Sequence, residues 1–159
     1  MKRETTFLKV CLLFIGIGIL ALSGLLFYLF HKEAQSGSMK MAIVLYGILG
    51  FMYTAAIPFY IALFNAFKLL CHIDTNKAFS ELSVTALRNI KRCAMVISLI
   101  YALSMPLFYI VGEVDDAPGV ILVGLFFVFS PLVVSVFAAV LQKLFENALE
   151  IKKDNELTI

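Results

Sequence analysis

The sequence predicts an all-α protein, an integral membrane four-helix bundle, on three observations. Hydrophobic residues make up 62% of the 159 residues, whereas soluble domains use about half, and the mean hydropathy is +0.97. Four apolar runs each have the roughly 20 residues that a helix needs to cross a bilayer core of about 30 Å. These runs are residues 7–30, 41–67, 93–112 and 119–141. One long polar segment, residues 68–92, separates the second run from the third. We therefore expect a single four-pass membrane domain over residues 1–159.

The basic residues predict how the helices are oriented. Of the 13 Lys and Arg residues, three lie around the start of the first run, five between the second and third runs, and three after the fourth. Only Lys32 and Lys40 lie between the first two runs, and none lies between the last two. Because short loops rich in Lys and Arg stay in the cytoplasm, both termini are expected to be cytoplasmic. Residues 31–40 and 113–118 are then expected to be short outer loops.

The first run resembles a secretory signal only in having basic residues before it. Its length exceeds the 7–15 apolar residues of a typical signal peptide, so an uncleaved first helix is expected. A cut between residues 34 and 38 is the alternative, and it would leave the other three spans in place.

Prolines lie inside three of the four apolar runs, at Pro58, Pro106 and Pro131. Proline removes a helical hydrogen bond and bends the helix. Bent helices suit ordinary packing in a membrane or a cavity, which tyrosines would line. The tyrosines in question are Tyr46, Tyr53, Tyr60, Tyr101 and Tyr109.

Residues with catalytic or metal-binding chemistry are scarce. No Asp, Glu, Lys, Arg or His lies in the middle of an apolar run, which argues against a pump or a proton-coupled transporter. Cys71, His72 and Asp74 form the one cluster of reactive types, but an adjacent Cys and His do not easily face one metal ion. We therefore expect no catalytic residue, no metal site, no cofactor and no enzymatic activity.

Residues 68–92, the hub segment, are expected to contain an amphipathic cytoplasmic helix at the membrane surface. Ser80 is a suitable N-cap, and Leu82, Leu87 and Ile90 recur at helical spacing on one side. Basic residues fall largely on other faces, where they can attract anionic lipid or a protein. The alternative is an orientation signal that happens to be helical. No Gly or Pro lies between Ser80 and Met105, so this helix should run directly into the third span.

Residues 142–159, the stalk, continue the fourth helix past the bilayer as a cytoplasmic extension. Leu144, Phe145 and Ala148 extend the apolar stripe, and such an exposed stripe must be covered. We expect the stalk to pack against the hub segment and to form a partner-binding surface with it. The predicted partner-binding residues are Arg88, Asn89, Lys91, Arg92, Asp154, Asn155 and Leu157.

The tracts KAFSELSVTALRNIKR and PLVVSVFAAVLQKLFENALEIKKDNELTI resemble the bacterial membrane family catalogued as domain of unknown function 2975. The chain departs from the family pattern at Ala78, where the family tends to proline, and at Ser83, where it tends to asparagine. It also departs at Asp154, Asn155 and Glu156, where the order of the acidic residues is shifted. The resemblance implies a multi-pass protein of the bacterial cytoplasmic membrane. It also implies a gene often placed beside that of a small helix-turn-helix regulator of the Cro type, with no activity established.

Two functions follow as expectations. The first is a non-enzymatic membrane partner or modulator of a small helix-turn-helix transcriptional regulator, bound on the cytoplasmic side without direct nucleic acid contact. The alternative is a small transport or immunity protein that acts against membrane-active peptides. It would use a continuous aromatic-lined cavity and the acidic outer turn formed by Glu113, Asp115 and Asp116. The sequence specifies no oligomeric state.

Overall fold

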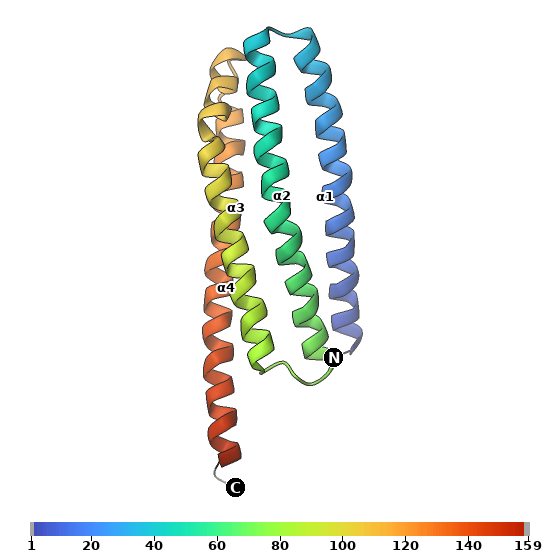
Figure 1. The fold of residues 1–159 in the computed structure, drawn as a ribbon, viewed down its shortest axis with the longest axis vertical. Coiled ribbons are helices and arrows are strands. Elements are labelled where there is room, and N and C mark those ends of the chain that lie inside the picture. The colour runs from blue at the N-terminus through green and yellow to red at the C-terminus, as the bar shows by residue number, and fades with distance from the viewer. Residues whose placement is uncertain (1, 158–159) are drawn as a thin grey trace.

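The computed structural model describes residues 2–157 and contains four long helices in that part of the chain (Figure 1). They are α1 (Lys2–Ser36), α2 (Met39–Asp74), α3 (Glu81–Val114) and α4 (Gly119–Leu157). At 1.5 Å per residue each is about 50–60 Å long, well beyond the roughly 30 Å of a bilayer core. All four are long and apolar enough to cross a membrane. The predicted all-α fold with four candidate spans is confirmed, while the membrane boundaries within each helix stay predictions.

The helices run up and down with short connections, so α1 begins and α4 ends at the same end of the bundle (Figure 1). The connection between α1 and α2, predicted as an outer loop over residues 31–40, is much shorter than expected, because α1 continues to Ser36 and α2 begins at Met39. Ser38 caps α2 by accepting a hydrogen bond from the Met41 amide at 3.3 Å. His31 is therefore a helical residue, and its Nδ1 lies 2.7 Å from the Tyr46 hydroxyl.

The four helices form an open row in which each one packs on the next in sequence. Within residues 2–157, α1 packs against α2 alone, α2 also packs against α3, and α3 against α4. The main buried cluster lies at the end opposite the termini and contains Leu45, Ile48, Phe108 and Val111. An open row is tolerated in a membrane, since lipid tails cover exposed apolar side chains as well as protein does.

The hub segment is not a separate helix at the membrane surface, and that part of the prediction is wrong. Residues 81–92 are the first three turns of α3, which continues to Val114. Ser80 is the N-cap, as predicted, and accepts a hydrogen bond from the Ser83 amide at 3.4 Å. Val84 and Leu87 are buried, so neighbouring helices cover part of the apolar face of this segment, whereas Leu82 stays exposed. The predicted direct run into the third span is confirmed.

Polar contacts hold α1 to α2. Tyr60 donates a hydrogen bond to the Gly16 carbonyl at 2.8 Å, and Lys9 and Thr5 both bind the Asp74 carboxylate. Hydrogen bonds from Lys9, and then from Thr5, hold the pKa of Asp74 below its usual range. Asp74 thus belongs to a helix-joining contact, and within residues 2–157 no group of three or more His, Cys, Asp or Glu is arranged to hold a metal ion.

Candidate interaction groove

The groove is built on a close antiparallel contact between α3 and α4. Ser98 donates a hydrogen bond to the Val128 carbonyl at 2.8 Å, and Ser135 donates to the Lys91 carbonyl at 3.2 Å. Both serines are buried, as are Ala94 and Ala138. Small side chains let helix backbones approach closely in a membrane. This contact sets the register between the two helices and aligns the start of α3 with the stalk part of α4.

Two ion pairs and one aromatic contact then join the start of α3 to the stalk. The Lys153 ammonium lies 2.9 Å from the Glu81 carboxylate, and Arg88 lies 3.7 Å from Glu146. The rings of Phe79 and Phe145 meet edge to face with their centres 5.3 Å apart. The predicted packing of the hub segment against the stalk is therefore present. The two apolar faces are not fully covered, since Leu82 of the hub segment and Leu144 of the stalk stay exposed.

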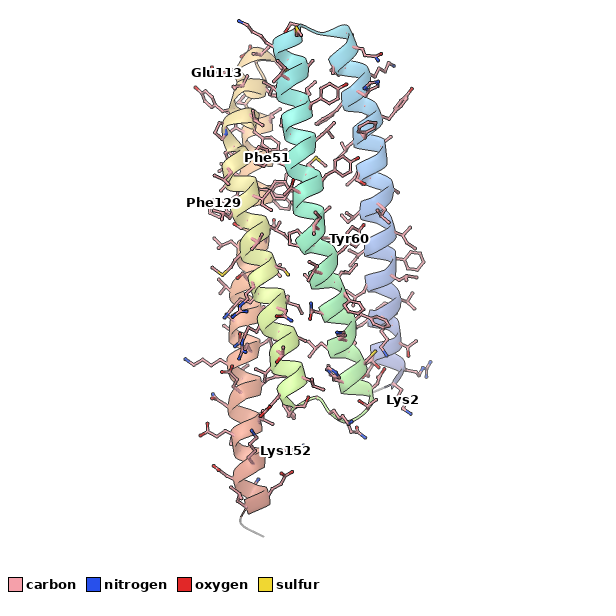
Figure 2. All side chains as sticks on the ribbon, viewed as in Figure 1. Lys2, Phe51, Tyr60, Glu113, Phe129 and Lys152 are labelled. Carbon is pink, nitrogen blue, oxygen red and sulfur yellow. The ribbon has the colours of Figure 1, made fainter. Side chains whose placement is uncertain are left out.

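A groove of about 570 Å³ lies beside these contacts. Its lining residues are Glu81, Val84, Thr85, Arg88, Glu146, Leu149, Glu150, Lys153, Asp154 and Leu157. Four carboxylates face two cationic side chains in this set, and three aliphatic residues contribute apolar surface. The groove thus combines a net negative charge with an apolar surface. Figure 2 shows that Lys152, on the same part of α4, lies at the end of the bundle opposite Glu113.

The structure brings three of the seven predicted partner-binding residues into this groove, namely Arg88, Asp154 and Leu157. The others lie elsewhere. Asn155 lines a separate groove of about 400 Å³ beside Phe79. The Asn89 amide is turned toward α2, where it donates a hydrogen bond to the Asn65 side-chain oxygen at 3.3 Å.

Lys91 and Arg92 do not line the groove. Lys91 is half-buried, and its backbone carbonyl accepts a hydrogen bond from the Ser135 hydroxyl in the contact with α4. Arg92 is exposed. Asn89, Lys91 and Arg92 thus lie on other faces of α3 than Arg88, because successive residues of a helix point in different directions.

Sequence reasoning missed the acidic side of the groove. Glu81, Glu146, Glu150 and Lys153 line the groove, but none of them is among the predicted partner-binding residues. The spacing of Glu146, Glu150 and Lys153 by three and four residues places them on one face of α4. Glu81 and Arg88 share a face of α3 in the same way. This periodicity was visible in the sequence, but the pairing of the two faces required the helix register.

Acid pH is expected to loosen the end of α4 from α3. The hydrogen bond from Lys153 holds the pKa of Glu81 below its usual range. Because the folded-state pKa is the lower one, this pair stabilises the packed form above the unfolded value of about 4.3, and the stabilisation is lost as the pH falls through the folded-state pKa. Hydrogen-exchange protection of residues 146–153 should therefore fall below about pH 4. Glu81→Gln should already lower that protection at neutral pH, and unchanged protection in this variant would contradict the assignment.

An aromatic cavity of about 270 Å³ lies between the four helices. It includes Tyr53 and Tyr101 from the predicted set of tyrosines, together with Phe59, Phe126 and Phe127. Tyr60 instead binds α1, Tyr46 binds His31, and Tyr109 donates a hydrogen bond to Glu113. Aromatic residues therefore gather at mid-depth of the bundle, as a binding cavity would require.

Four long apolar helices, with most of the charged groups at one end of the bundle, define a four-helix integral membrane protein. The chain belongs to the family described as protein of unknown function (DUF2975), whose model matches residues 3–159, so the resemblance seen in the sequence is confirmed. A Bacillus subtilis (strain 168) protein described as "Uncharacterized membrane protein YoaS" is 50% identical over 161 residues, with 99% of each chain covered. No solved structure matches the chain significantly.

Proposed function

We propose that this protein is a non-enzymatic bacterial membrane protein that holds a small helix-turn-helix transcriptional regulator at the cytoplasmic face of the membrane. The groove between α3 and the stalk carries the proposal, because it is acidic, partly apolar and formed beyond the predicted spans. The excess of basic residues at this end of the bundle supports a cytoplasmic position for the groove and for both termini.

The charge of the groove favours a basic partner. Its four carboxylates outnumber its two cations, and complementary charge speeds association and selects partners. The apolar surface of Val84, Leu149 and Leu157 suits the apolar face of an amphipathic helix laid along the groove. Regulators of this class carry a basic surface for DNA phosphates. A regulator that binds the groove through its basic surface could not bind DNA through the same surface, so this protein and DNA would compete for the regulator.

The test reverses charges in the groove and measures how much of the regulator encoded beside the gene stays in the membrane fraction. The double variant Glu150→Lys with Asp154→Lys should release the regulator, with binding weakened at least about tenfold, since like charges across an interface are strongly unfavourable. Deletion of residues 154–159 should act in the same direction. Glu113→Lys changes the same charge at the opposite end of the bundle and serves as the control. Retention in the double variant equal to that of the parent would overturn the proposal.

A second candidate is a small transport or immunity protein, and the aromatic cavity between the four helices favours it. Cationic membrane-active peptides would meet the acidic outer turn first, because Glu113, Asp115 and Asp116 lie at the end of the bundle opposite the groove. Cells that carry Tyr101→Ala or Phe127→Ala should then become as sensitive to such peptides as cells without the gene. Groove variants should leave this sensitivity unchanged, which separates the two functions.

A further inference from the structure

A second polar pocket, of about 370 Å³, lies between the end of α2 and the start of α3. Its lining residues are Phe64, Asn65, Phe67, Lys68, Cys71, His72, Leu82, Thr85, Ala86 and Asn89. Lys68 directly follows the second predicted span, and Asn89 precedes the third. The pocket therefore lies at the level where the bilayer core gives way to lipid headgroups.

The floor of the pocket is a built polar site. Asn65 is 8% exposed; its amide donates to the Ile61 carbonyl at 2.8 Å, and its oxygen accepts from Asn89 at 3.3 Å. Within residues 2–157, the buried Nδ1 of His72 has no hydrogen-bond partner. A buried polar atom of this kind is costly unless something binds it. The His72 ring lines the pocket and contributes polar surface beside Asn65 and Asn89.

Uncompensated positive charge lies at the rim. The Lys68 ammonium lies 4.7 Å from the centre of the Phe64 ring, and in the described part of the chain Lys68 and Arg92 form no ion pair, unlike Arg88 and Lys153. Leu82, Asn89 and Arg92 follow the three- and seven-residue spacing of one helix face, which places Arg92 one turn beyond the pocket toward the membrane. An anion at the mouth would thus lie beside the Lys68 cation of α2, with the Arg92 cation one turn further along α3.

The other half of the pocket is apolar and open. Phe64, Phe67 and Leu82 line it and are all exposed on the outside of the bundle. Phe64 and Phe67 lie in the last two turns of the second predicted span, where a lipid acyl chain would pass. A free phosphate ion would leave this apolar half unused, whereas a phospholipid fills both halves.

We propose that the pocket between α2 and α3 binds the headgroup of an anionic phospholipid. The phosphate lies beside Lys68 and accepts a hydrogen bond from the Asn89 amide, Arg92 adds positive charge one turn away on α3, and an acyl chain lies along Phe64 and Phe67. Basic pockets between membrane helices on the cytoplasmic side recognise anionic headgroups in this way. The proposal does not depend on the regulator function, because it uses a different pocket and different residues.

The test uses a single tryptophan as a reporter, because the chain contains none. Phe64→Trp keeps an aromatic ring beside Lys68, and quenching by brominated phosphatidylglycerol is compared with quenching by brominated phosphatidylcholine in vesicles of matched content. We expect preferential quenching by phosphatidylglycerol at Phe64→Trp. Phe129→Trp, an exposed residue on α4, should show no preference, since it meets bulk lipid.

Charge variants in the Phe64→Trp protein identify the residues responsible. Lys68→Gln and Arg92→Gln should each lower the lipid preference by about fivefold, while the charge-conserving Lys68→Arg and Arg92→Lys should keep it. Lys152→Gln, in the stalk, should change nothing. Equal quenching by the two lipids at Phe64→Trp would overturn the proposal. Binding of inorganic phosphate together with equal quenching by the two lipids would assign the site to a free anion.

Discussion

Leu87→Ala is expected to lower the free energy of unfolding by about 2–5 kcal/mol, the usual range for a buried Leu→Ala substitution. Leu87 is 3% exposed, although it lies in the polar segment between two membrane spans. At that level water and headgroups replace lipid tails, so the hydrophobic effect can act on this part of the bundle as it does in a soluble core. The measurement is equilibrium unfolding in detergent micelles, followed by circular dichroism.

Leu82→Ala is the matched control for this prediction. Leu82 lies in the same helix and is 61% exposed, so its truncation should change stability by less than about 0.5 kcal/mol. Similar losses in the two variants would mean that the start of α3 does not form a buried contact with its neighbours.

Gly124→Leu is expected to destabilise the contact between α3 and α4 by about 1–3 kcal/mol, the typical cost of overpacking. A Cβ atom at Gly124 would lie 3.0 Å from both Met105 and Phe108, and a leucine would extend further into the same space. The two helices would have to separate, which would also disturb the groove at their far end. Thermal unfolding of the purified protein measures the effect.

Gly18→Leu provides the control, because a Cβ atom at Gly18 would meet no atom within 4 Å apart from its chain neighbours and the nearby backbone of its own helix. Both substitutions replace glycine with leucine inside a long apolar helix, so the difference between them isolates the helix contact. An equal shift in the unfolding temperature of both variants would contradict the tight packing at Gly124.

Local features of the fold could be predicted from the sequence because they depend on residues close together in the chain. Membrane-length apolar runs predicted the four helices, and Ser80 predicted the start of α3. The lack of Gly or Pro after Ser80 predicted its continuation into the third span. The prediction of a separate helix at the membrane surface was wrong. An amphipathic pattern shows that the apolar face of a helix must be covered, but it does not identify whether lipid or another helix covers that face.

The tertiary structure alone decided which polar residues meet. Arg88 and Asn89 are neighbours in sequence, yet one faces Glu146 of α4 and the other faces Asn65 of α2. Hydropathy and helical spacing determine the faces of each helix, whereas the pairing of faces depends on the register between helices. Buried serines and glycines that allow close approach set that register. The sequence therefore determined a four-span protein with a basic end, and helix packing decided that this end holds an acidic groove and a separate pocket lined by Lys68.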